Sequence, residues 1–245
     1  MYTRFAEVYD RLMDDIDYEK WAEFMLRLLE KEDIVPKTAC DCGCGTGGLT
    51  FALKNREIQV VGVDISEEML FIAAEKSRRL GVKVPFVRQD MASLSLHRPV
   101  DAIFSAIDGV NYLLTADQVK AFFEAAYGLL NPGGALVFDV STKTKLEGMH
   151  GNLYFEDYPD LSYFWQNAYD KSSGVLTMDL AFFVKRNDGL YEKFVECQRQ
   201  RAHTYMEMKS LLAESGFTAV RAYGDKLFAP PRPDEERIFV LAKRN

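Results

Sequence analysis

The sequence predicts an α/β protein with a doubly wound, mainly parallel seven-stranded sheet. Short apolar runs alternate with helical patterns along most of the chain, which is typical of parallel sheets. The last two predicted strands, residues 218–223 and 237–243, have no helix between them. A parallel return needs a crossover, so we expect this final pair to form an antiparallel hairpin. A change of pattern at residues 146–201 predicts a small inserted antiparallel β-sheet.

The composition bounds the size and class of the protein. The chain has 245 residues, 48% of them hydrophobic, which is enough for one core with an insertion. Its formal net charge is −7 and no long basic run is present, so nucleic-acid binding is not expected. No apolar run approaches the ~20 residues of a membrane span, and the first ten residues lack the apolar core of a signal peptide. We therefore expect a cytoplasmic protein that does not bind membranes.

Three of the four cysteines lie close together, at Cys40, Cys42 and Cys44, and Cys197 is far away in the sequence. Metal knuckles usually separate their ligands by two or more residues and need a fourth partner. We predict small, half-buried thiols at the end of a strand and no metal site.

Two helices are predicted before the first strand. Residues 1–15 place apolar side chains at helical spacing, and a second helix begins after Asp17 and ends before Pro36. Asp17 can cap this second helix. A plain dinucleotide-binding domain often begins on its first strand, so these helices depart from that pattern.

Strands and helices then alternate, with recognisable helix caps. Ser66 is a predicted cap, and Thr115 with Gln118 and Thr204 with Glu207 are predicted capping boxes. The expected strands are residues 38–42, 59–63, 84–88, 101–106 and 135–140. The expected helices are 49–54, a helix capped by Ser66 and closed by Gly81, 116–130, which residues 131–134 end, and 205–215.

The inserted segment, residues 146–201, has the period of two that is typical of strands. Apolar residues alternate with others from Leu176 to Val184, and Asp188-Gly189 indicates a hairpin turn. We expect this sheet to cover a ligand site on a core formed by residues 1–145 and 202–245. The alternatives are that it serves local packing or the interface of a homodimer.

A glycine-rich turn follows the first predicted strand, with Gly43, Gly45 and Gly47 before a short helix. Glycines let the backbone turn tightly and approach a ligand, and the helix directs its free N–H groups at the turn. Asp64 ends the second strand nineteen residues after Gly45, where an acidic side chain can bind ribose hydroxyls. The pattern predicts a cofactor that contains adenosine, and taken alone it also fits a nicotinamide-dependent enzyme. Asp90 and residues 105–108 also follow strands and should lie at the same edge of the sheet.

Together these segments resemble the class I S-adenosylmethionine-dependent methyltransferases. The resemblance covers about residues 36–142 and 204–243, and the opening residues look like small bacterial members of that group. The matching segments are Asp41-Cys42-Gly43-Cys44-Gly45-Thr46-Gly47, Val63-Asp64-Ile65-Ser66, Gln89-Asp90-Met91, Asp101 and Asn131-Pro132-Gly133-Gly134.

The resemblance implies roles for several of the candidate cofactor-binding residues. The glycines approach the methionine part of the cofactor, Asp64 binds both ribose hydroxyls, and Asp90 reaches the adenine amine. Ile65 and Met91 pack on the adenine. The complete predicted set is Tyr9, Trp21, Asp41, Gly43, Cys44, Gly45, Gly47, Asp64, Ile65, Met69, Gln89, Asp90, Met91 and Ser105.

The implied reaction is methyl transfer from S-adenosylmethionine to a small-molecule acceptor, and positioning can supply much of its rate. No catalytic base is evident, because His97, His150 and His203 are expected at the surface or in packing. Residues conjectured to line an acceptor pocket are Asn111, Tyr112, Tyr154 and Tyr205.

Three alternatives remain at the level of sequence. An NAD(P)-dependent oxidoreductase is disfavoured by Asp41, by the early helices, by the final hairpin and by the lack of a Tyr-x-x-x-Lys dyad. A non-catalytic S-adenosylmethionine-binding module fits the absence of an evident base. RNA methylation is disfavoured by the acidic composition.

Overall fold

The structure is a computed structural model, and it describes residues 5–245. Its helices are α1 (Phe5–Leu12), α2 (Tyr18–Glu30), α3 (Gly48–Lys54), α4 (Glu67–Leu80), α5 (Ala116–Leu129), α6 (Lys143–Gly148) and α7 (Tyr205–Glu214), with short 3-10 helices η1 (Met91–Ser93) and η2 (Gly109–Tyr112). Its strands are β1 (Thr38–Cys42), β2 (Gln59–Asp64), β3 (Phe86–Arg88), β4 (Val100–Ser105), β5 (Leu130–Ser141), β6 (Leu153–Asp157), β7 (Leu161–Asp170), β8 (Val175–Lys185), β9 (Tyr191–Arg201), β10 (Ala219–Gly224) and β11 (Arg237–Lys243). No helix in this described range is long and apolar enough to cross a membrane.

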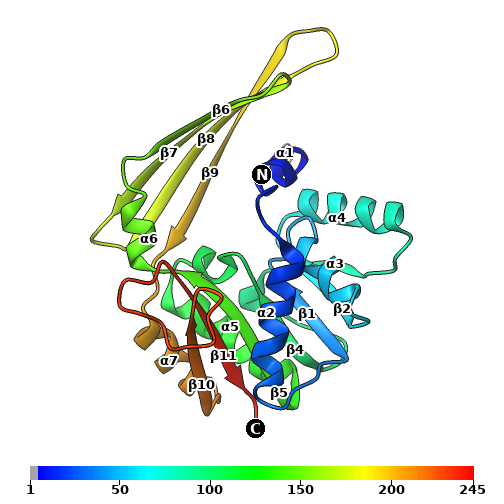
Figure 1. Cartoon of the computed structure of the whole chain (residues 1–245), viewed down its shortest axis with the longest axis vertical. Coiled ribbons are helices and arrows are strands. Elements are labelled where there is room, and N and C mark those ends of the chain that lie inside the picture. Colours follow the sequence, from blue (N-terminus) through cyan, green and yellow to red (C-terminus); the bar gives the residue numbers. More distant parts are fainter. Residues whose placement is uncertain (1–4) are drawn as a thin grey trace.

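The main sheet has seven strands in the order β10-β11-β5-β4-β1-β2-β3 (Figure 1). β1 pairs in parallel with β2 and β4, whereas β11 is antiparallel to both β5 and β10. The predicted fold class and the antiparallel pair at the end of the chain are confirmed. The order reverses at β1, so the carboxyl ends of β1 and β4 flank the crevice in which such sheets bind ligands.

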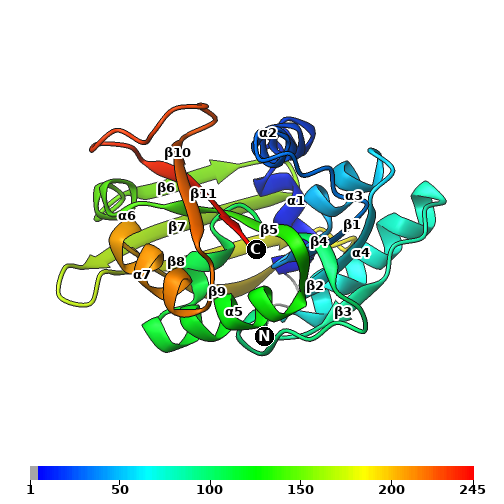
Figure 2. The same ribbon diagram turned by 90° about the horizontal axis from the view of Figure 1, so that it is seen from below.

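Helices cover both faces of this sheet (Figure 2). Alternate strand residues point to opposite faces, so Cys40 and Cys42 join the core under α5 and α7, while Ala39 joins the core under α2 and α3. The three clustered thiols are buried, and Cys40 Sγ lies 3.6 Å from Cys42 Sγ. Among the described residues no group of histidine, cysteine or acidic side chains could hold a metal ion.

The inserted segment forms a separate four-stranded antiparallel sheet in the order β6-β7-β8-β9. It rises as an arm above the main sheet, and α1 lies between this arm and α4 (Figure 1). Phe5 and Val8 of α1 share a hydrophobic cluster with Phe182 of β8 and Met69 of α4. The N-terminal helix therefore joins the arm to the core.

Several local predictions hold and some need correction. Ser66 caps α4 and Thr115 forms a capping box with Gln118, as predicted. Thr204 caps α7, but the Glu207 side chain pairs with Arg201. Helix α5 ends before residues 131–134, as predicted, but β5 begins at Leu130 and already includes them. Helix α6 was not predicted. The predicted helical start at residues 1–4 lies outside the described residues.

A buried ionic network joins three strand ends. Arg237 of β11 contacts Asp139 of β5 and Asp108, which follows β4. Asp139 is fully buried, and its carboxylate accepts hydrogen bonds from the backbone N–H groups of Ile107 (2.6 Å) and Asp108 (3.2 Å). Ile107 and Asp108 have positive φ angles of 56° and 66°, which side chains with a Cβ rarely adopt. The network thus holds a strained turn at the end of β4.

We expect Arg237→Met to lower the free energy of unfolding by about 3 to 5 kcal/mol, because it leaves Asp139 buried without its partner. Urea titration at pH 8 measures the change. The matched control is Arg78→Met, because Arg78 pairs with Glu75 at the surface and should contribute less than about 1 kcal/mol. Equal, small losses in the two variants would contradict the importance of the network.

Candidate functional site

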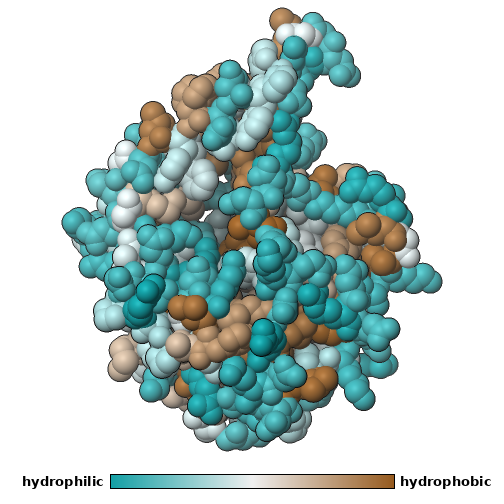
Figure 3. Space-filling model, viewed as in Figure 1, coloured by the Kyte–Doolittle hydropathy of each residue, from teal (hydrophilic) through white to brown (hydrophobic). Residues whose placement is uncertain are grey.

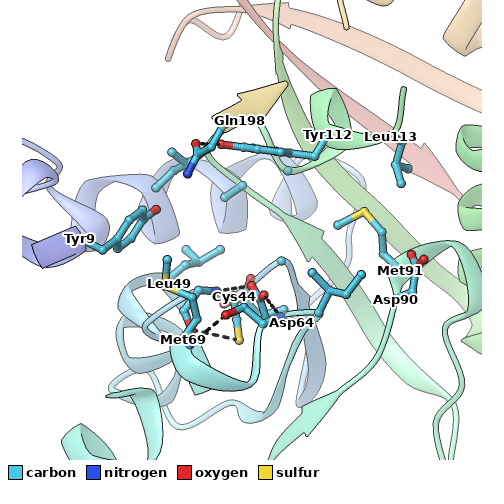
Figure 4. Close-up of a pocket in the computed structure, with 18 of the residues that line it drawn as sticks. Tyr9, Cys44, Leu49, Asp64, Met69, Asp90, Met91, Tyr112, Leu113 and Gln198 are labelled. Carbon is cyan, nitrogen blue, oxygen red and sulfur yellow. Dashed lines mark hydrogen bonds between the residues drawn. The ribbon is translucent and has the colours of Figure 1, made fainter. Parts of the chain in front are cut away.

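A cavity of about 410 Å³ opens at the carboxyl ends of β1, β2 and β4. A hollow with apolar side chains at its floor is visible between the arm and the core (Figure 3). Figure 4 shows side chains from both parts facing this cavity. Of the predicted cofactor-binding residues, those that line it are Tyr9, Asp41, Gly43, Cys44, Gly45, Asp64, Ile65, Met69, Gln89, Asp90 and Met91.

The glycine turn forms one wall of the cavity. Gly43 and Gly45 have φ angles of 71° and 53°, in the left-handed region that favours glycine. The N–H groups of Gly43 and Cys44 both donate to the carbonyl of Val63, at 2.8 and 3.0 Å, which fixes the turn on β2. A Cβ added to Gly43 would lie 3.3 Å from Cε of Met91, so glycine also keeps this part of the wall open.

Asp64 stands at the centre of this wall (Figure 4). One carboxylate oxygen accepts from Gly45 N at 2.8 Å and the other from Ser66 N at 2.9 Å. Burial raises the pKa of Asp64, and these backbone donors oppose the rise. The same carboxylate that lines the cavity therefore connects the glycine turn to the start of α4.

Asp41 lies deeper, where β1 meets α3. It is 1% exposed and accepts a hydrogen bond of 2.5 Å from Oγ1 of Thr50. Burial raises its pKa to about 7, although the bond from Thr50 opposes this shift. A carboxyl group with such a pKa can ionise when a cation binds beside it.

Helix α1 covers the glycine turn. Asp10 accepts a hydrogen bond from Thr46 Oγ1 at 2.6 Å and pairs with Lys76 Nζ at 2.5 Å. On its other side Arg11 pairs with Asp160 in the arm at 3.0 Å. Tyr9 is thereby placed over Gly45, and burial raises its pKa well above the usual value.

The opposite wall comes from η2 and β9. Tyr112 donates a hydrogen bond of 2.9 Å to Oε1 of Gln198 across the cavity mouth. Asn111 is fully buried, and its amide nitrogen binds the carbonyls of Ser141 and Arg201, each at 2.9 Å. Asn111 therefore positions η2 against the entry and exit of the arm and does not line the cavity.

The sequence analysis missed Cys197, Gln198 and Arg199, which line the cavity from β9. The alternation of β9 identifies a strand, but only the packing of the arm places this segment beside the glycine turn. Of the conjectured acceptor-pocket residues Tyr112 lines the cavity, while Tyr154 and Tyr205 do not.

Three predicted cofactor-binding residues lie outside the cavity lining. Trp21 is buried against Phe239 and beneath Arg237, because α2 turns this side chain into the core. Gly47 caps α3 at a φ of 88°, and Ser105 is fully buried below the cavity floor. Trp21 therefore packs in the core and does not line the cavity.

Gln89 and Asp90 line the cavity but also make local bonds. The Gln89 side chain binds both backbone groups of Ser95, at 2.8 and 3.0 Å. Asp90 accepts from Ala92 N at 2.9 Å and caps η1. His203 is buried, with its Nε2 2.8 Å from the carbonyl of Leu113, as expected of a packing histidine.

Comparison with known proteins identifies the family. A family model described as a methyltransferase domain matches residues 39–134. A protein of Geobacillus sp. (strain WCH70), named as a methyltransferase, is 33% identical and covers 99% of each chain. The methyltransferase YqeM of Bacillus subtilis is 32% identical over 100% of this chain and 98% of its own. A crystal structure of an S-adenosylmethionine-dependent methyltransferase from Clostridium acetobutylicum is 30% identical, with a TM-score of 0.88 over 100% of this chain and 99% of that one.

The chain belongs to the class I methyltransferase family, and its cofactor is S-adenosylmethionine. The site fits S-adenosylmethionine, because the glycine turn, the oriented carboxylate of Asp64 and the buried carboxyl group of Asp41 face one cavity. This assignment decides against a nicotinamide-dependent oxidoreductase.

The pKa of Asp41 leads to a prediction for the protein without cofactor. The unfolded carboxyl ionises near pH 4, whereas the folded one keeps its proton up to about pH 7. The resulting stabilisation is complete below pH 4 and is lost as the pH rises through 7. We expect the free energy of unfolding of the wild type, relative to Asp41→Asn, to fall by about 2 to 3 kcal/mol between pH 5 and pH 8. Urea titrations of both proteins at these pH values measure it, and a difference independent of pH would contradict a buried acid here.

Proposed function

We propose that the protein transfers the methyl group of S-adenosylmethionine to a small-molecule acceptor. One observation carries this proposal: a single cavity is lined both by the glycine turn with Asp64 and by Tyr9, Tyr112 and Gln198 from α1, η2 and β9. Two ligands can therefore meet in one cavity. A cavity of about 410 Å³ lies within the range that small ligands occupy. We also propose that the protein is cytoplasmic, as expected from the sequence.

Each wall has a distinct part in the proposed reaction. Asp64 would bind the ribose hydroxyls, and the glycine turn would hold the methionine part against Asp41. When bound there, S-adenosylmethionine supplies an electrophilic methyl group on a cationic sulfur. Tyr9 and the arm exclude water, and Tyr112 with Gln198 orients the acceptor, so positioning supplies much of the rate.

Parallel calorimetric titrations with S-adenosylmethionine, S-adenosylhomocysteine and NADH test the cofactor part of this proposal. We expect micromolar binding of the first two compounds and none of NADH, because Asp41 and Asp64 suit a cofactor with a cationic methionine part. Binding of NADH alone would overturn the proposal. Tight binding without methyl transfer to any acceptor class would favour the non-catalytic module.

The role of Asp64 has its own test. Asp64→Asn keeps the shape of the side chain but removes its charge, and hydrogen bonds to charged groups contribute about 1.5–3 kcal/mol. We expect roughly 10- to 100-fold weaker binding of S-adenosylmethionine by calorimetry, with unchanged cooperative unfolding. The control is Glu67→Gln, which alters an exposed carboxylate nearby and should bind normally. Unchanged affinity in Asp64→Asn would refute the ribose assignment.

The remaining partner predictions stay as proposals. With a net charge of −7 we expect no nucleic-acid substrate. A homodimer remains a prediction from the aromatic composition of the arm.

A further inference from the structure

The far half of the cavity is built from α1, η2 and β9. Within residues 5–245 its lining side chains include no histidine, lysine or carboxylate; they are Phe5, Tyr9, Tyr112, Leu113, Cys197, Gln198 and Arg199. The lining carboxylates, Asp41, Asp64 and Asp90, all follow or belong to strands of the main sheet. Two of them are bonded to the glycine turn or to α3, and Asp90 caps η1.

Glu196 lies on the same face of β9 as Gln198 but outside the cavity lining. The hydroxyl and thiol groups near this half of the cavity are poor proton acceptors. Burial raises the pKa values of Tyr9, Tyr18 and Cys44, so these groups keep their protons at neutral pH. Burial also raises the pKa of Cys197. His203 does not line the cavity, and its two ring nitrogens face Leu113 on one side and Arg201 with Glu207 on the other.

One polar group does face the open space. Gln198 accepts from Tyr112 through Oε1, and its amide nitrogen lies on the side toward Tyr9 (Figure 4). This Nε2 has no hydrogen-bond partner in the described part of the chain, so it offers N–H donors to a bound molecule.

The lack of a base in this half of the cavity distinguishes between hydroxyl and amine acceptors. A hydroxyl that attacks a methyl group forms an oxonium, which must lose its proton to a base as the bond forms. A neutral amine attacks through its lone pair and needs no base in that step. The positive charge of the methyl donor disfavours an ammonium ion beside it, so an amine can release its proton to water on binding.

Resting on the function proposed above, we propose that the methyl acceptor is an amine, and that Nε2 of Gln198 binds an oxygen of the same molecule. The nitrogen lone pair forms the new N–C bond while the electron pair of the S–C bond stays on sulfur, which changes from a sulfonium to a thioether. The methylated ammonium then loses its proton to water. Gln198 is a specificity-determining residue in this scheme.

The first experiment identifies the methylated atom. The full-length protein and S-adenosylmethionine are incubated with pooled metabolite-like amines, alcohols, phenols, thiols and carboxylic acids, and products are analysed by mass spectrometry. We expect new N-methyl products only. O-, S- or C-methyl products would overturn the amine inference while leaving the methyltransferase function intact. No product from any class, with tight cofactor binding, would overturn both.

The second experiment tests the absence of a base. We measure kcat/KM against pH for accepted amines of different pKa values. The apparent pKa of each profile should follow that of the amine, because the proton goes to solvent. A midpoint that stays fixed across the series would reveal a protein base and contradict the proposal.

The third experiment tests Gln198. Gln198→Met keeps the volume of the side chain and removes the N–H donors, so KM for an accepted amine should rise by roughly 3- to 10-fold. The affinity for S-adenosylmethionine should not change. Gln166→Met, on an exposed position of β7, is the control and should leave KM unchanged. An unaltered KM in Gln198→Met would refute the oxygen contact.

Discussion

The buried carboxylate of Asp139 holds the turn after β4 that leads to η2 on the far wall of the cavity. It accepts the backbone N–H groups of Ile107 and Asp108, and Arg237 balances its charge. These contacts hold two successive residues in a left-handed conformation, so the chain turns sharply after β4. The next element is η2, which carries Tyr112 to the cavity and the Asn111 amide to both ends of the arm. That turn and helix α1 together fix the arm on the sheet.

The two carboxyl groups around Arg237 have pKa values that are shifted in opposite directions. Burial alone would raise the pKa of Asp108, but Arg237 and Lys145 hold it below the usual value. Asp139 has the opposite outcome, because burial raises its pKa to about 6 in spite of Arg237. Lys145 belongs to α6, which leads from β5 into the inserted segment. The network thus extends from the last strand of the core to the beginning of the arm.

The cofactor end of the site is predictable from sequence because its signals are local. The glycines of the turn need positive φ angles, and Asp64 follows a strand at a fixed separation, so each can be recognised from a few neighbouring residues. The helix caps are predictable for the same reason. Thr204 illustrates the limit, since its Glu207 partner is taken by Arg201 from a different element.

The end of the cavity that we propose for the acceptor depends on packing between distant segments, which sequence patterns do not report. Gln198 lies in an alternating strand like many others, and only the position of the arm brings it 2.9 Å from Tyr112. Trp21 was predicted to bind the cofactor but packs in the core. An aromatic residue at helical spacing fits a core and a ligand site equally well. Its contact with Phe239 joins residues far apart in the chain.

The distribution of thiols has a practical consequence. Cys40, Cys42 and Cys44 are buried, whereas Cys197 is exposed and lies beside Gln198 in β9. A maleimide dye will therefore react at one position of the unmodified protein. That position lines the cavity, so the fluorescence of the attached dye can report ligand entry in real time without an engineered cysteine.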